Sequence, residues 1–261
     1  MKDHYSIQIY DPQPRLARKN SDEAGLVVRR QRRQLLPTKY AVISVPTPPQ
    51  KDGSGDTSLV EETVIKSKHQ YYLIKSTVVP GTSRRLVEKT GKKIAFSPEY
   101  LGEGKYAVPF WKDYPHPTDM KFHQFHIFGG ERQTTRAWVE VWQKVAGWGS
   151  TYVQTDSTTA ELVKYMENTF FATKKIFCDE FYDIARAFGV DYNELKELWL
   201  LDGRIGRSHT LIYPDKRGFV GKCLPKDVVA LVRVAEKAGY SPELIKSVLA
   251  VNQEMIKKNK N

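Results

Sequence analysis

The sequence predicts an α/β fold in which a parallel sheet, within residues 1–155, is followed by a long helix and an all-helical unit, within residues 156–261. Short β-branched and aromatic runs alternate with helix-like segments in the first part, as a parallel sheet with crossover helices requires. After about residue 155 the apolar residues follow a helical period throughout. The 261 residues, 40% hydrophobic and 11% aromatic, suffice for a packed core, which excludes intrinsic disorder for most of the chain.

Six short segments are predicted as strands and three segments between them as helices. The strands are SIQIY (6–10), YAVISV (40–45), YYLIKS (71–76), KIAF (93–96), FHIF (125–128) and TYVQ (151–154). The helices lie near 58–68, 82–91 and 132–146. YAVISV and YYLIKS are nearly continuous apolar runs, which are typical of strands covered on both faces. This alternation predicts a right-handed parallel sheet.

One long helix is predicted to open the second part. Its apolar residues recur at three-, four- and seven-residue steps: Leu162, Met166, Phe170, Phe177, Phe181, Ile184 and Phe188. This period predicts a helix of about thirty residues with a single apolar stripe. We expect so long a helix to pack against something beyond its own domain, and we expect Gly189 to end it.

Capping signals predict where the later helices begin. Asp191 and Glu194 have the spacing of a capping box, and Ser241–Pro242 has the order of an N-cap and a first-turn proline. Between these helices, residues 202–222 follow neither the helical nor the strand period. A loop of that length is usually functional.

The chain is basic, with 41 Lys and Arg residues against 30 Asp and Glu residues and a formal net charge of +11. The excess predicts attraction for polyanions, and the densest cluster is Arg29, Arg30, Arg32 and Arg33. Zinc-finger spacing, an RNP-like aromatic stretch and a basic region leading into heptads are all missing from the sequence. We therefore expect a basic surface or a site for a phosphorylated small molecule, and not a nucleic-acid-binding protein.

Compartment and redox state are indicated by two further features. No apolar run reaches the roughly 18 to 20 residues that a membrane span needs, and the opening residues lack the apolar centre of a signal peptide. We therefore expect a cytoplasmic protein without membrane contact. The two cysteines, Cys178 and Cys223, cannot form a disulfide framework or a zinc site alone, and we expect no metal. Cys178 lies among apolar residues of the long helix and is predicted to be a core residue.

Cys223 has the surroundings of a reactive thiol. It follows a glycine-containing turn in GFVGKCLPKD (218–227), with Lys222 and Lys226 beside it and Asp227 as a candidate helix cap. A helix N-terminus and two ammonium groups lower the pKa of a thiol and favour the nucleophilic thiolate. The alternative is a small buried hydrophobe, the usual role of a lone cysteine. The neighbouring lysines and proline favour reactivity.

Polar groups elsewhere are placed for contact with a ligand. Lys164 and Asn168 are four residues apart and share one face of the long helix, where they can hold an oxyanion or a water. The segments 76–82 and 96–104 follow predicted strands, and ligands of open α/β sheets bind beyond the carboxyl ends of strands. The alternatives are solvated helix residues and ordinary turn chemistry.

Six segments in order resemble the UDP-glucose/GDP-mannose dehydrogenase family, with UDP-glucose 6-dehydrogenases the most similar branch. They are VPTPPQKDGSGD (45–56), KSTVVPGT (75–82), FSPEYLGEG (96–104), AELVKYMENTF (160–170), DGRIGRSHT (202–210) and GFVGKCLPKD (218–227). The resemblance implies an NAD-linked, four-electron oxidation of the C6 alcohol of a nucleotide sugar, UDP-glucose first, to the carboxylate. It also implies a cysteine thiohemiacetal and thioester as intermediates, and a homodimer built on the long helix.

The resemblance carries three sets of residues onto this sequence. The catalytic positions are those of the nucleophile Cys223, of the oxyanion- and water-binding Lys164 and Asn168, and of Glu99, Thr77 and Asp227. The positions along the substrate are Tyr100, Leu101, Lys164, Asn168, Gly218 and Gly221, with Arg204 reaching the substrate of the neighbouring subunit. The cofactor positions are Asp11, Thr47, Thr77, Glu103 and Lys226.

The match is also expected to be incomplete at both ends. The family's first strand, its G-x-G-x-x-G turn for the pyrophosphate and its third domain find no counterpart, and GEGKYA (102–107) opens into VPFWKDYPHP and not into a helix. The expected fold is thus an incomplete Rossmann-like sheet followed by a helical dimerisation domain. Val220 stands where the family has a glycine. A catalytically impaired nucleotide-sugar-binding or scaffold protein, without the glycine-rich NAD loop, stays open as the alternative function.

Overall fold

The computed structural model describes residue 7, residues 38–101 and residues 123–259. The predicted strand at 6–10, Asp11, the arginine cluster of 29–33 and Glu103 lie outside these ranges. The described residues divide into two compact units. The sheet unit comprises 38–45, 60–76, 83–101 and 123–160, and the helical unit comprises 46–59, 77–82 and 161–259. The division falls inside one continuous helix, and two loops that follow strands group with the helical unit.

The sheet has five strands in the spatial order β1-β2-β3-β4-β5 within the described residues. They are β1 (Tyr40–Ile43), β2 (Tyr71–Ile74), β3 (Lys93–Phe96), β4 (Phe125–Gly130) and β5 (Thr151–Thr155). The pairs β1–β2, β2–β3 and β4–β5 are parallel, as predicted. Each of the five corresponds to a predicted segment, with ends that differ by at most two residues.

The prediction of a wholly parallel sheet is wrong at one pair, because β3 and β4 run antiparallel. They meet through Ala95↔Gly130 and Phe96↔Gly129. Gly130 has a positive φ of 151°, and a Cβ there would lie 2.9 Å from the carbonyl oxygen of Ile94. Gly130 thus permits this close pairing, and the apolar pattern of a strand carries no information about its direction.

Three helices match the predicted ones: α2 (Ser58–Lys66), α3 (Thr82–Thr90) and α4 (Arg132–Ala146). Helix α4 packs on β3, β4 and β5. Its Trp138 and Trp142 are buried in a cluster with Leu73 and Phe128, and the Trp138 indole Nε1 donates to the carbonyl oxygen of Tyr72 at 3.1 Å. The buried ring thus satisfies its one polar group, as amphipathic aromatic residues in cores do.

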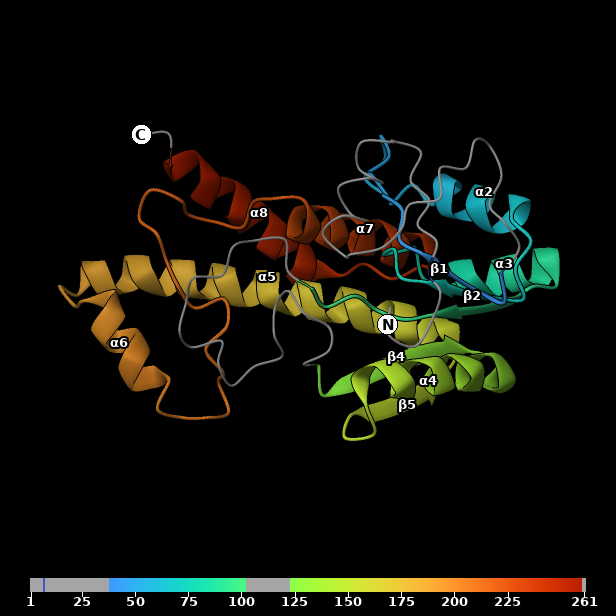
Figure 1. Ribbon diagram of the computed structural model, residues 1–261. Helices are drawn as coiled ribbons and strands as arrows, with labels where there is room; N and C mark the ends of the chain where they lie inside the picture. The colour runs from blue at the N-terminus through green and yellow to red at the C-terminus, as the bar shows by residue number, and fades with distance from the viewer. Residues whose placement is uncertain (1–6, 8–37, 102–122, 260–261) are drawn as a thin grey trace. The chain divides into compact units, whose positions relative to one another are not determined.

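The helical unit is built on α5 (Ser157–Ala187), which has 31 residues and can be followed along its length in Figure 1. The other helices are α6 (Tyr192–Trp199), α7 (Cys223–Lys237) and α8 (Glu243–Lys258). Gly189 ends α5 as predicted: at φ 69° its N–H bonds to the Arg186 carbonyl, and the Val190 N–H bonds to the Ala185 carbonyl. This is the Schellman arrangement, in which a left-handed residue closes the last turn.

The predicted apolar stripe of α5 lies on an exposed face of the chain. The exposed fractions are Leu162 43%, Met166 77%, Phe170 59%, Phe177 45%, Phe181 39%, Ile184 41% and Phe188 81%. The core of the unit instead takes smaller residues of α5, Ala172 and Ile176, which pack with Phe219, Val228 and Met255. The stripe therefore does not contribute to the core of its own unit.

Two predicted caps need correction. Helix α8 begins at Glu243 with Pro242 as the capping residue, and the Ser241 hydroxyl bonds the Glu243 carboxylate at 2.6 Å instead of a backbone N–H. Asp227 does not cap α7, because the helix already begins at Cys223 and Asp227 lies buried in its second turn. Asp191 does cap α6, accepting from the Asn193 N–H. Among the described helices, none is both long enough and apolar enough to span a membrane.

Candidate functional site

The two cysteines differ in the way that the sequence predicts. Cys223 is exposed and is the first residue of α7, after the irregular segment 200–222. Its thiol therefore lies where the helix macrodipole favours a negative charge. Cys178 is 1% exposed, and burial raises the pKa of its thiol above the ordinary value. Only Cys223 is accessible to a substrate.

A hydrogen-bonded cluster lies in the same unit as Cys223. Asn168, 6% exposed on α5, donates from Nδ2 to Asp227 Oδ2 at 2.6 Å. Lys226 donates from Nζ to the other oxygen of the same carboxylate, also at 2.6 Å. A buried carboxylate needs such partners, since burying a charge without them is costly. The predicted residues Asn168, Asp227 and Lys226 are thus brought together as one network.

Lys164 lies one turn before Asn168 and is mostly buried, with 14% of its side chain exposed. Its Nζ is 3.7 Å from Glu167 Oε2. Burial raises the pKa of the Glu167 carboxyl, and the nearby Lys164 ammonium acts in the opposite direction. Lys164 thus presents a partly buried cation beside the Asn168 cluster on the same helix.

A residue that the sequence did not single out holds the loop with Thr77. Glu161 is 1% exposed, and its Oε2 accepts from the Gly81 N–H at 2.5 Å. The Thr82 hydroxyl closes the same loop through the Val79 carbonyl at 2.6 Å. Thr77 itself is half-buried. The signal for Glu161 was its place in the helical motif AELVKYMENTF, one turn before the predicted Lys164.

Glu99 occupies a cluster within the sheet unit. Its Oε1 accepts from the backbone N–H groups of Tyr100 and Leu101 at 2.9 and 3.0 Å. The buried Lys75 ammonium lies 3.4 Å from Glu99 Oε2 and donates to the Pro98 carbonyl at 2.9 Å. Burial raises the pKa of Glu99, but Lys75 and the two N–H groups outweigh it and hold the pKa of this carboxyl below its ordinary value. Glu99 is therefore ionised near neutral pH, as a proton acceptor must be.

A small recess beside Glu99 is lined by Lys75, Tyr100 and His126 among other residues. The Tyr100 ring packs edge-on against Phe125, with ring centroids 5.1 Å apart. Burial, and then the charge of Lys75, lower the pKa of His126 to about 4. His126 is thus neutral at physiological pH, and Lys75 is the cation beside Glu99 in this cluster.

The other predicted residues have the following places. Thr47 is buried, with 8% exposed. Arg204 is exposed and its Nη2 pairs with Asp202 Oδ2 of its own loop at 2.6 Å. Gly218 and Gly221 adopt φ values of 78° and 100°, which only glycine adopts readily. Val220, between them, is 65% exposed.

The residues present fit NAD only in part. Of the residues predicted to contact a dinucleotide, Thr47, Thr77 and Lys226 lie among the described residues. Within 38–101 and 123–259, however, no turn between a strand and a helix has the G-x-G-x-x-G or G-x-G-x-x-A spacing. A pyrophosphate cradle of backbone N–H groups at a helix N-terminus is therefore not supplied by the described residues.

Comparison with known proteins identifies the family. Residues 158–254 match the central domain of the UDP-glucose/GDP-mannose dehydrogenase family. The UDP-glucose 6-dehydrogenase of Haloferax volcanii is 33% identical over 244 residues, which are 84% of this chain and 53% of that protein. The corresponding protein of Rickettsia prowazekii is 32% identical over 222 residues, which are 81% of this chain and 48% of that protein.

A solved structure agrees with these sequence matches. The UDP-glucose dehydrogenase of Pyrobaculum islandicum superposes with a TM-score of 0.71 at 30% identity, covering 94% of this chain and 58% of that one. The α/β fold is therefore the Rossmann-like fold of these enzymes. The chain belongs to the UDP-glucose/GDP-mannose dehydrogenase family, as its motifs predict. It spans about half the length of the curated relatives that it matches.

Proposed function

We propose that this chain takes part in the NAD-dependent oxidation of the C6 alcohol of a nucleotide sugar to the carboxylate, with UDP-glucose as the substrate. The observation that carries the proposal is the exposed Cys223 at the N-terminus of α7, in one unit with the buried Asn168–Asp227–Lys226 network. The names of the similar proteins support UDP-glucose as the substrate.

Cys223 supplies the nucleophile in this scheme. The alcohol first loses a hydride and a proton to become an aldehyde, and the thiolate then adds to the aldehyde carbon to give a thiohemiacetal. Loss of a second hydride and proton gives a thioester. Water attacks the thioester, breaks the C–S bond and releases the carboxylate and the thiol. NAD, when bound, supplies the hydride acceptor for both oxidation steps.

The other groups hold charge and water around the reacting carbon. The ammonium of Lys164 and the amide of Asn168 stabilise the oxyanion that forms on each addition. Asp227 fixes the Asn168 amide through the 2.6 Å bond, which leaves its orientation determined before substrate binds. Glu99, ionised beside Lys75, accepts protons, with Thr77 ordering the water. The family resemblance assigns Tyr100, Leu101, Gly218 and Gly221 to positions along the sugar nucleotide, and Thr47 and Lys226 to positions that contact the cofactor.

The test measures NADH formation from NAD and UDP-glucose. We expect two NADH per sugar oxidised, and we expect Cys223→Ser to abolish the thioester route. Cys178→Ala is the matched control, because a buried thiol has no chemical role, and its activity should stay within about twofold of the unmodified protein. Unchanged activity in Cys223→Ser would refute the mechanism. A protein that binds UDP-glucose without forming NADH would be the impaired binding protein instead.

We propose further that a second copy of the chain covers the apolar face of α5 defined by Leu162, Met166, Phe170, Phe177, Phe181, Ile184 and Phe188. These residues are 39–81% exposed, and a contiguous exposed apolar face marks an interaction site. A face of one helix can meet the same face of a second copy across a two-fold axis, the commonest symmetry of homo-oligomers. In such a dimer the exposed Arg204 can reach the substrate of the neighbouring copy.

A further inference from the structure

The chain is buried just before the nucleophile and exposed at the nucleophile itself. Arg217, Gly218 and Phe219 are each buried, with Arg217 4% and Phe219 3% exposed. Residues 220–223 that follow are exposed, and Cys223 is the last of them. The position of Cys223 therefore depends on how firmly the buried segment is held.

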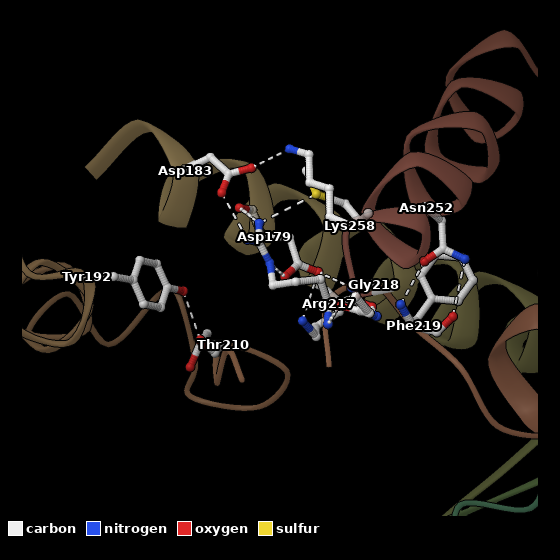
Figure 2. Close-up of polar contacts among 12 residues, drawn as sticks. Asp179, Asp183, Tyr192, Thr210, Arg217, Gly218, Phe219, Asn252 and Lys258 are labelled. Carbon is white, nitrogen blue, oxygen red and sulfur yellow. Dashed lines mark hydrogen bonds and ion pairs between the residues drawn. The ribbon is translucent and has the colours of Figure 1, made fainter. Parts of the chain in front are cut away.

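Asp179 of α5 is the centre of that attachment (Figure 2). Its side chain has no exposed surface, and its carboxylate takes three hydrogen bonds. Arg217 Nε donates to Oδ1 at 2.7 Å, and Lys175 Nζ and the Gly218 backbone N–H donate to Oδ2 at 2.8 and 2.9 Å. A carboxylate that is buried and fully satisfied has little freedom to move, because displacement would leave a charge without partners.

The Arg217 guanidinium completes the same network. Its Nη1 donates to Asp183 Oδ1 at 2.9 Å and its Nη2 to the carbonyl oxygen of Asp179 at 2.6 Å. The guanidinium also lies over the Tyr182 ring, 4.6 Å from the centroid. Lys258 Nζ bonds the second oxygen of Asp183 at 2.7 Å. Burial disfavours the Asp183 charge, but Arg217 and Lys258 lower the pKa of this carboxyl below its ordinary value.

Two asparagines of the α8 segment hold the backbone from the other side. Asn252 Oδ1 accepts from the Phe219 N–H at 2.7 Å, and its Nδ2 donates to the Phe219 carbonyl at 3.2 Å (Figure 2). Asn259 makes the same pair of bonds with Arg217, at 2.7 and 2.9 Å. Between them, Gly218 leaves no room for a side chain, since a Cβ would lie 2.7 Å from Asn252 Oδ1.

A second anchor lies on the other side of Cys223. Asp227, four residues further on, bonds Asn168 at 2.6 Å. Asn168 and Asp179 both belong to α5 and are eleven residues apart, about three turns, so that both face the same side of the helix. The exposed Cys223 thus lies, along the chain, between two buried residues, Gly218 and Asp227, that are each hydrogen-bonded to α5.

We propose that Asp179 is a positioning residue for Cys223: by binding the Gly218 N–H and the Arg217 side chain, it fixes the segment from which the nucleophile extends. This rests on the proposed function, in which Cys223 attacks the aldehyde. Arg217 neutralises the Asp179 charge so that the carboxylate can be buried. Asp179 touches no reacting atom and acts through its contacts with the Gly218 N–H and the Arg217 side chain.

The test compares Asp179→Asn with Asp183→Asn in the full chain. Both substitutions keep the size of the side chain, remove one negative charge and alter a contact with Arg217, but only Asp179 binds the loop backbone. In Asp179→Asn we expect kcat to fall by about ten- to a hundredfold with KM little changed, because small displacements of a reacting group are costly. Asp183→Asn should stay within about twofold of the unmodified protein.

Hydrogen–deuterium exchange gives a readout that needs no turnover. The Gly218 and Phe219 amides should lose protection in Asp179→Asn, while the amides of β2 and β3 keep theirs and Asp183→Asn matches the unmodified chain. If Asp179→Asn does not fold, Asn259→Ala is the second variant. It releases only the Arg217 backbone, and it should lower protection at Arg217 and Gly218 in the same direction.

The two proposals fail separately. Absence of NADH formation by the unmodified protein refutes the proposed function, while the exchange result still decides whether Asp179 fixes the loop. Turnover by the unmodified protein with equal kcat in Asp179→Asn and Asp183→Asn refutes the positioning role alone. Equal loss of kcat in both variants also refutes it, since the loss would then follow the charge and not the backbone contact.

Discussion

The two faces of α5 reverse the usual pattern of a surface helix, in which apolar residues are buried and polar residues are exposed. The buried face carries Asn168, Asp179 and the small Ala172, whereas the exposed face carries Phe170, Phe177 and the other residues of the apolar stripe. In most globular proteins the apolar stripe faces the core of its own domain. Here buried polar groups of α5 hydrogen-bond the segment before Cys223, and the apolar residues lie on the exposed face. Our two proposals assign the positioning of Cys223 to the first face and association with a second copy to the other.

Substitutions that disturb the buried polar face should lower the unfolding free energy more than substitutions on the exposed face. Arg217→Met removes the guanidinium that Asp179 and Asp183 share, and leaves both carboxylates with one lysine each. Removing one partner of a buried ion pair costs about 3–5 kcal/mol, because an uncompensated charge stays buried. Urea unfolding followed by circular dichroism should show this loss of unfolding free energy.

A surface pair in the same unit provides the control. Arg207 binds Glu197 through two bonds of 2.8 and 2.7 Å, but 38% of the Arg207 side chain and 49% of the Glu197 side chain are exposed. Arg207→Met should cost less than about 1 kcal/mol, as exposed ion pairs contribute little. Equal effects of Arg217→Met and Arg207→Met would contradict the view that the Asp179 network is an interior structure.

Adjacent residues of α5 allow the two faces to be compared directly. Ile176 is 4% exposed in the core and Phe177 is 45% exposed on the apolar stripe. Ile176→Ala should lower the unfolding free energy by about 2–5 kcal/mol, through lost burial and a cavity. Phe177→Ala should change the stability of the isolated chain by less and should weaken self-association, as measured by sedimentation velocity over a concentration series.

The comparison between the faces is contradicted if Ile176→Ala mainly weakens self-association and Phe177→Ala mainly lowers the unfolding free energy. If the unmodified protein is a monomer at all concentrations, the proposal that a second copy covers the apolar stripe is refuted. An Ile176→Ala variant with full stability would mean that the cluster around Phe219 does not depend on α5.

The smallest expected effect is a pH dependence of the unfolding free energy that comes from His209, which packs against Phe171 of α5. His209 stacks on the half-buried Phe171 with ring centroids 4.2 Å apart. Burial, and then the charges of Lys174 and Lys175, lower the pKa of His209 to about 4, whereas an unfolded histidine has a pKa of about 6.5. The stability that depends on neutral His209 is complete above about pH 6.5 and is lost as the pH falls toward about 4.

The measurement is the unfolding free energy of the unmodified protein and of His209→Asn at several pH values. Asparagine tolerates the positive φ of 63° at this position and does not titrate. We expect the unmodified protein to lose about 2 kcal/mol more than the variant between pH 7 and pH 4.5. Parallel pH profiles for the two proteins would show that His209 titrates normally.

The sequence predicted the elements of the fold better than it predicted which residues contact one another. Period and turn residues located each described strand and the long helix, because these are local properties. The apolar stripe of α5 was found, but a period does not tell whether it faces a core or another chain. Asp179 and Arg217 were missed, since they are 38 residues apart and charged residues are common in this chain. Only the spacing of Lys175 and Asp179, on the face that carries Ala172, indicated a buried charge.

The eleven residues between Asn168 and Asp179 make α5 intolerant of changes in length. Inserting one residue between them would turn the second anchor by about 100° around the helix axis and move it by about 1.5 Å along it. Asp179 would then point away from Gly218 although every contacting residue was still present. A substitution between the two anchors changes the contacts of one residue, whereas a single insertion or deletion would separate the two attachments of the Cys223 loop at once.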